Sequence, residues 1–178
     1  AGESAPVRVV RASFGEASSA PVEPAIEPQP GEAVRRHEEI RAIGMTQPRR
    51  GRFVFDLGQN MVGWARVRVR GHAGQRVVLR YAEMLNPDGT MYTSNLRGAT
   101  ATDFFTLRDG EQVLEPLFTF HGFQYVEITG VDECPTLGDV VGIVVHSEME
   151  PAGEFECSSA LVNQLVHNIE WGQKGNYV

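Results

Sequence analysis

The sequence predicts an all-β fold, an antiparallel β-sandwich or jelly roll that is followed by one C-terminal helix. Between Gly51 and His146 we expect about seven short strands, separated by turns rich in glycine, aspartate and asparagine. In several of them apolar and polar side chains alternate, which is typical of a sheet with one face in a core and one in water. This stretch also lacks the strand–helix–strand order that would indicate a parallel sheet.

The first fifty residues have the weakest pattern. Pro6–Arg11 is compatible with one short strand, the last of a preceding β-domain, and Ser18–Gly31 holds four prolines that suit an extended linker. A period of two returns over Glu38–Met45 and ends at Pro48–Gly51. We therefore assign residues 1–50 to the end of a preceding β-domain and a Pro-rich linker.

Residues 51–64 organise the strands that follow. A β-run over Arg52–Leu57 is predicted to stop in a turn at Leu57–Asn60, because glycine and asparagine adopt positive φ at little cost. A second strand leaves through Gly63 and runs to Arg70. Its alternation predicts a core face and a water face, formed respectively by Ala65, Val67, Val69 and by Trp64, Arg66, Arg68, Arg70.

The same alternation continues beyond residue 70. Gln75–Glu83 is a predicted strand with Val77, Leu79 and Tyr81 on its core face. Asn86–Gly89 is a predicted turn, in which proline presets φ and glycine supplies the positive φ that follows. Four more strands are expected, over Thr102–Leu107, Val113–Phe120 (with Leu114, Pro116, Phe118 and Phe120 on one side), Phe123–Thr129 and Val140–His146.

In residues 151–178 the apolar pattern changes from the period of a strand to that of a helix. Gly153–Cys157 resembles one last strand, after which Ser158 or Ser159 would cap a helix that ends near Gly172. We assign residues 51–150 to the sandwich and residues 151–178 to a last strand and a linker helix. The helix would carry a wide apolar stripe, made of Leu161, Val162, Leu165, Val166 and Ile169. Such a stripe needs a partner surface, either the sheet or a helical domain outside this chain.

Composition narrows the classes of function. The 178 residues carry a net charge of −7, which argues against a nucleic-acid partner. No apolar run approaches the ~20 residues of a membrane helix. The start, Ala1–Ser4, lacks the cationic and apolar parts of a signal peptide, which says little about the compartment; we favour the cytoplasm and leave secretion open. Cys134 and Cys157 are expected as separate thiols, with a disulfide as the alternative.

No catalytic or metal site stands out. The chain has 23 acidic residues, yet no spacing singles out the pair that a glycosidase requires. The acidic residues that lie within patterned sequence, and are therefore the candidates for such a pair, are Glu83, Asp88, Asp103 and Glu115. A nucleophile elbow, Gly-x-Ser-x-Gly, is absent, and the five histidines lack ligand spacing, so we expect no catalytic residue, metal or cofactor. Of the histidines, His121 is expected to order a turn between strands.

Carbohydrate binding is the strongest functional hypothesis for the segment itself. Sugar sites combine an aromatic face with amides or carboxylates that bind hydroxyl groups. Trp64, on the arginine side of its strand, could act with Gln59 and Asn60 of the adjoining turn, and the irregular segment 90–101 could contribute similar groups, Tyr92, Asn95 and Arg97. Arginine stems often cover a tryptophan on a sheet face, and packing beneath a neighbouring domain is a second alternative.

A series of short motifs runs through the chain in order: Phe55–Asn60 with Gly63–Trp64, Tyr81–Glu83, Asp88–Tyr92, Asn95–Arg97, Phe118–Val126, Val145–Ser147, Phe155–Ser158 and Asn168–Gln173. Together these motifs resemble the β-domain that precedes the catalytic barrel in bacterial α-L-rhamnosidases. The resemblance extends from about residue 52 to the end of the chain. The first fifty residues match least, at a place where some relatives carry a rhamnose-binding module.

The resemblance implies a concanavalin-like β-sandwich and a linker helix that leads into an (α/α)6 barrel. In that family the barrel carries the acidic residues that hydrolyse terminal α-L-rhamnosides with inversion, and no such residue falls on a position of this sequence. The implied role is an ancillary structural domain, itself non-catalytic, whose partners are the barrel and other β-domains of the same polypeptide. The alternative is a free-standing carbohydrate-binding module that recognises rhamnose or a related sugar.

Overall fold

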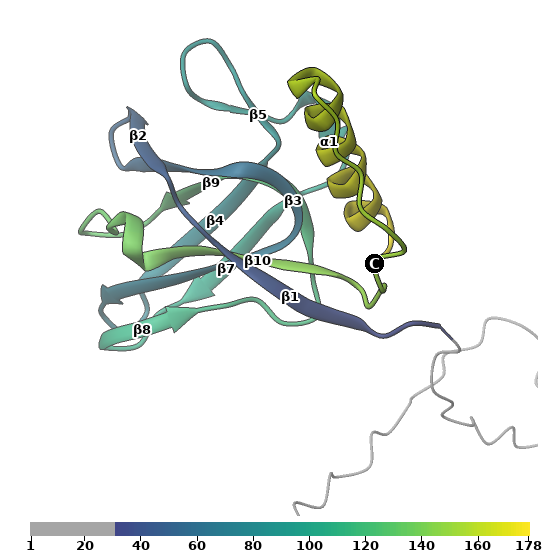
Figure 1. Cartoon of the computed structure of the whole chain (residues 1–178). Helices are drawn as coiled ribbons and strands as arrows, with labels where there is room; N and C mark the ends of the chain where they lie inside the picture. Colours follow the sequence, from purple (N-terminus) through teal and green to yellow (C-terminus); the bar gives the residue numbers. More distant parts are fainter. Residues whose placement is uncertain (1–30) are drawn as a thin grey trace, which may run out of the picture. The chain divides into compact units, whose positions relative to one another are not determined.

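The computed structural model describes residues 31–178, in which every paired strand is antiparallel (Figure 1). The elements are β1 (Val34–Arg41), β2 (Gly44–Arg49), β3 (Arg52–Gly71), β4 (Arg76–Ala82), β5 (Met84–Leu85), β6 (Met91–Tyr92), β7 (Thr102–Thr106), β8 (Gly110–Leu114), β9 (His121–Thr129), β10 (Val140–Ser147) and the helix α1 (Ala160–Asn176). The predicted strand Pro6–Arg11 and nearly all of the predicted linker Ser18–Gly31 lie outside the described residues.

One strand, β3, belongs to both layers of the sandwich. Its first residues, 52–56, pair with β2 on one side and with β9 on the other, and β4 and β7 extend this layer. Its later residues, 63–71, pair with β10 and β8, and β1 extends the second layer beyond β10. Figure 1 shows β3 curving between the two layers. A strand that changes sheets in this way turns at a bulge or bend.

The bend lies at residues 57–63, which we call the β3 corner. The register with β9 shifts between Asp56 and Met61, so the intervening residues are unpaired with that strand. Gly63 then pairs with His121 of β9 and with Val144 of β10, and thereby joins the two layers. The predicted chain reversal at Leu57–Asn60 is therefore wrong: the segment is a bulge within one 20-residue strand.

The space between the layers is filled by the predicted core faces. Val67 and Val69 of β3 are buried, and the three predicted core residues of β4 have no exposed surface. The largest of the fully buried side chains in the described part of the chain come from both layers: Phe55, Leu57, Val67, Val77, Leu79, Tyr81, Phe123, Val126, Ile128, Val140, Ile143 and Val144. Each such apolar side chain contributes about 1.5–3 kcal/mol of transfer free energy, so burial between the layers is the main stabilising term.

Strands β1 and β2 are hydrogen-bonded to strands of the sandwich. Arg35 and Arg36 of β1 pair with His146 and Val145 of β10, and Met45 of β2 pairs with Phe55 of β3. The unit that contains them runs from residue 32 to residue 178. The predicted domain boundary at residue 50 remains a prediction, but strands on both sides of it share one sheet.

Two further predictions of strands are wrong. β8 ends at Leu114, because Pro116 has no amide donor and the segment after it turns outward, with Phe118 at a φ of 58° and fully exposed. Gly153–Cys157 is not a strand either, since it pairs with no strand within the described residues. Its alternation is a local pattern without a pairing partner.

The C-terminal helix forms as predicted and continues past Gly172 to Asn176. Ser159 is its N-cap residue, although its side chain makes no capping hydrogen bond. α1 contacts β3 and β10, and Trp171 packs against the core between the layers. No helix in the described part of the chain is both long and apolar enough to cross a bilayer.

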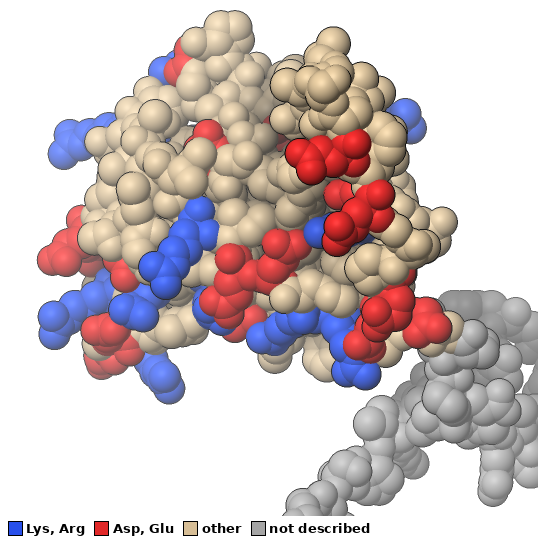
Figure 2. All heavy atoms as spheres, in the orientation of Figure 1, with Lys and Arg blue, Asp and Glu red and all other residues tan. Residues whose placement is uncertain are grey.

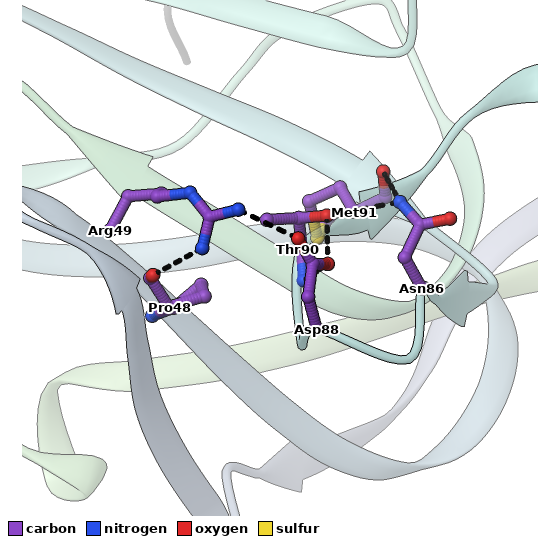
Figure 3. A network of polar contacts seen from close by, with 6 residues as sticks. All are labelled: Pro48, Arg49, Asn86, Asp88, Thr90 and Met91. Carbon is purple, nitrogen blue, oxygen red and sulfur yellow. Dashed lines mark hydrogen bonds and ion pairs between the residues drawn. The ribbon is translucent and has the colours of Figure 1, made fainter.

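The small sheet of β5 and β6 is tied to β2 by one polar network (Figure 3). Asp88 in the predicted turn accepts hydrogen bonds from the Thr90 amide and hydroxyl, at 3.1 and 2.6 Å, and pairs with Arg49 at 2.7 Å. The Thr90 hydroxyl and amide, followed by Arg49, hold the pKa of the Asp88 carboxyl below its ordinary value. The turn over Asn86–Gly89 is confirmed, with Gly89 at a φ of 79°.

The β3 corner has room only for glycine at position 63. A Cβ on Gly63 would stand 1.8 Å from the carbonyl oxygen of Ile143 in β10, and φ there is 152°. We expect Gly63→Ala to lower the free energy of unfolding by about 3 kcal/mol or more, because backbone must move apart. Urea denaturation of the 178-residue chain measures this change.

Gly44→Ala is the matched control, since a Cβ on this strand glycine would meet nothing within 4 Å. Its expected effect lies within about 0.5 kcal/mol. Equal effects of the two substitutions would contradict the assignment of a steric role to Gly63.

Candidate functional site

Three of the six predicted sugar-binding residues meet at the β3 corner. Glu83, which follows β4, accepts hydrogen bonds from Asn60 Nδ2 at 3.2 Å and from Asn95 Nδ2 at 2.9 Å. The Gln59 side chain lies beside them and donates to the Asn60 carbonyl oxygen at 2.8 Å. The bulge places Gln59 and Asn60 here, because it leaves both residues unpaired with β9.

Helix α1 forms a wall of this cluster. His167 Nε2 lies 3.3 Å from Gln59 Oε1, and the neighbouring turn of the helix places Trp171 against the core. The cluster thus presents amides, one carboxylate and one imidazole at the junction of β3, β4 and α1. These groups can bind hydroxyl groups, but each already has a partner within the described residues.

Trp64 belongs to a different site. Its indole nitrogen donates to Glu115 Oε1 at 2.8 Å, and the guanidinium of Arg36 lies over the ring at 5.1 Å. Arg36 also pairs with Glu115 at 3.0 Å, so three side chains from β1, β3 and the segment after β8 hold one another. Trp64 lines a groove of about 490 Å³ together with Phe118 and Phe120.

The remaining two predicted residues join neither set through a hydrogen bond among residues 31–178. Tyr92 is half-buried in β6, opposite Met84. Arg97 is exposed at a φ of 56°, after the 3₁₀ turn Ser94–Leu96. The predicted single face is therefore divided: the corner cluster holds Gln59, Asn60 and Asn95, and Trp64 lies in the aromatic groove.

The four carboxylates that sequence reasoning considered have separate partners. Glu83 binds the corner amides, Asp88 binds Thr90 and Arg49, and Glu115 binds Trp64 and Arg36, as described above. Asp103 accepts a hydrogen bond from the Tyr81 hydroxyl at 2.8 Å and lies 3.2 Å from His121 Nε2. No two of these four carboxylates share a hydrogen-bonding partner within the described residues.

Sequence reasoning missed the role of His121. The residue begins β9 and does not order a turn: its ring stacks on that of Tyr81, with centroids 4.2 Å apart, and its Nε2 faces Asp103. Burial of the Tyr81 hydroxyl, followed by the nearby Asp103 charge, raises the pKa of that phenol well above its ordinary value. The tyrosine therefore stays protonated and donates its hydrogen bond. Tyr81, Asp103 and His121 thus form a network at the edge of the core in which the polar groups bind one another.

The two layers and the curving β3 define the class of domain as an antiparallel β-sandwich of the concanavalin-like type. A family model described as "Bacterial alpha-L-rhamnosidase concanavalin-like domain" matches residues 46–146. The chain belongs to this family.

Individual relatives agree with this assignment. An α-L-rhamnosidase of Streptomyces avermitilis is 53% identical over 146 residues, which are 82% of this chain and 14% of the relative. The crystal structure of a Streptomyces avermitilis α-L-rhamnosidase complexed with L-rhamnose has a TM-score of 0.81 at 52% identity, over 83% of this chain and 14% of that one. The α-L-rhamnosidase from Dictyoglumus thermophilum has a TM-score of 0.81 at 43% identity, over 83% of this chain and 17% of that one. The chain thus spans about one seventh of the length of such relatives.

Proposed function

We propose that this domain is a structural support within an α-L-rhamnosidase, and that α1 holds the catalytic barrel of the same polypeptide against the sandwich. The support for this proposal is an apolar stripe on α1 that no described residue covers. Leu161, Leu165 and Ile169 are 82%, 57% and 59% exposed. They follow one another at intervals of four residues and therefore share one side of the helix. Figure 2 shows only uncharged atoms over the upper end of α1, where the helix begins.

The opposite side of α1 is held by the sandwich. Trp171 packs against the core, Lys174 Nζ pairs with Glu38 of β1 at 3.0 Å, and the same ammonium lies 4.4 Å from the Trp171 ring centroid. The Tyr177 carbonyl oxygen accepts a hydrogen bond from the Ser147 amide at 2.7 Å. The helix thus has a fixed orientation, and its apolar stripe points away from the sandwich as a preformed surface for a second domain.

The length of the relatives supports the same role. Their chains are about seven times as long as the segment that this protein matches, and domains within one chain bury apolar surface against each other. A contiguous apolar stripe on a fixed helix is typical of a surface that another protein surface covers. The hydrolysis of terminal α-L-rhamnosides would then take place in the barrel.

The stripe can be tested in the full-length polypeptide that contains this domain. We expect Leu161→Glu/Leu165→Glu to cost about 2 kcal/mol or more of stability per leucine covered at the interface, and to lower the rate of aryl α-L-rhamnoside hydrolysis after mild heating. In the 178-residue chain the same double substitution should change stability by less than about 0.5 kcal/mol. Calorimetry of both proteins measures the difference.

Gln164→Glu/Asn168→Glu is the matched control, because it adds the same charge to the same helix without removing apolar surface. If the leucine variant of the full-length polypeptide melted and hydrolysed like the unchanged protein, α1 would have no supporting role.

A second candidate function is the recognition of rhamnose or a related sugar. The observation that favours it is the groove beside Trp64, in which Phe118 holds a strained positive φ and a fully exposed ring. Bulky residues take this conformation rarely, and often at sites that contact a ligand.

Titration of the 178-residue chain with L-rhamnose, followed by tryptophan fluorescence, tests this candidate. A saturable change that Trp64→Ala abolishes and Trp171→Phe preserves would support it, provided that circular dichroism shows both variants folded. A linear response without saturation would exclude the groove as a rhamnose site.

A further inference from the structure

A cleft of about 500 Å³ lies on the outer face of the layer formed by β2, β3, β9, β4 and β7. The register aligns Val54, Glu127, Arg80 and Thr102 across four strands, and aligns Arg52, Thr129 and Val78 in the next row. Residues that pair across strands point to the same side of a sheet. The polar lining is thus Arg50, Arg52, Arg80, Thr102, Glu127 and Thr129. None of these residues belongs to the corner cluster or to the groove beside Trp64.

The charge of the cleft is opposite to that of the chain. Three guanidinium groups face a single carboxylate, whereas the 178 residues together carry a net charge of −7. Glu127 pairs with Arg52 at 3.0 Å. Within residues 31–178, no carboxylate oxygen lies within 4.0 Å of the guanidinium nitrogens of Arg50 or Arg80. Among these residues, the guanidinium groups of Arg50 and Arg80 therefore have no ion-pair partner, so both can bind an anion.

Polar contacts hold two of the three arginines, Arg52 and Arg80, in place. The Glu127 side chain is only 3% exposed, and its ion pair holds the guanidinium of Arg52. Arg80 donates to the Thr93 hydroxyl at 3.2 Å, in the segment that follows β6. Each guanidinium has five N–H donors, so most donors of Arg52 and Arg80 remain for a ligand. A fixed guanidinium loses little conformational entropy when it binds, which favours recognition.

An apolar surface adjoins the charged one. Phe104 of β7 pairs with Val78, which lines the cleft, so its ring projects from the same face. That ring is 60% exposed, although it is large and apolar, and the guanidinium of Arg76 lies 5.7 Å from its centroid. Aromatic faces, threonine hydroxyls and forked donors are together the groups that bind the C–H face, the hydroxyls and the acid group of a charged sugar.

We propose that this cleft binds an acidic saccharide, a sugar that carries a carboxylate or a sulfate ester. The anionic group lies between Arg50 and Arg80, the ring hydroxyls meet Thr102 and Thr129, and the ring packs toward Phe104. The inference is independent of the supporting role of α1, because α1 contributes no residue to the lining.

Titration of the 178-residue chain with digalacturonate, by calorimetry and by amide NMR, tests this inference. We expect saturable binding, with shifts at the Thr102 and Thr129 amides and a Kd that rises with salt. The dimethyl ester of digalacturonate, which lacks the charge, and inorganic sulfate, which lacks the sugar, should each bind at least tenfold more weakly. Arg80→Met and Arg50→Met should each weaken digalacturonate binding at least tenfold.

Arg70→Met is the matched control, because it removes one exposed arginine from the part of β3 that pairs with β8, outside the cleft. It should leave the Kd unchanged. Four results would each overturn the proposal: no saturation at millimolar digalacturonate, equal affinity for the ester, equal affinity for sulfate alone, or equal loss in Arg70→Met. Thermal melts of the variants establish that they are folded.

Discussion

The close approach of Gly63 to the backbone of β10 is the constraint on which the rest of the structure depends. At this residue β3 leaves β9 and joins β10, so both layers of the sandwich meet one peptide segment. A side chain there would occupy the position of the Ile143 carbonyl oxygen. Since the core lies between the layers, their spacing and relative orientation follow from how β3 passes this point (Figure 1).

The attached elements meet at the same corner. Gln59 contacts His167 of α1, and Asn60 contacts Glu83 at the end of β4. The corner therefore contacts the helix whose apolar stripe we assign to the contact with a catalytic barrel. The acidic-saccharide cleft lies on the outer face of one layer, where the cross-strand register aligns its charged side chains. The bend thus contacts the helix, whereas the cleft depends on the pairing of β3, β9, β4 and β7 within one layer, and neither surface shares a residue with the other.

Much of the fold could be predicted because burial imposes a period of two: Val67 and Val77 lie in the core as their alternation indicates. The bulge could not be predicted, because Gly58 and Asn60 have the same local preferences in a bulge as in a turn. Only the pairing with distant strands decides between the two. The divided site has the same cause. Gln59 and Asn60 were predicted beside Trp64, yet the corner brings Asn60 to Glu83 and Gln59 to His167, partners that no local pattern indicates.

Native-state hydrogen exchange of the β3 amides tests most directly whether the two layers depend on one strand. If the corner couples them, amides of residues 53–55 and of residues 65–67 exchange with the same free energy of opening, equal to that of global unfolding. They also respond equally to urea. An opening of the layer β1–β10–β3–β8 at distinctly lower free energy, while the layer that contains β9 and β4 stays protected, would contradict the account.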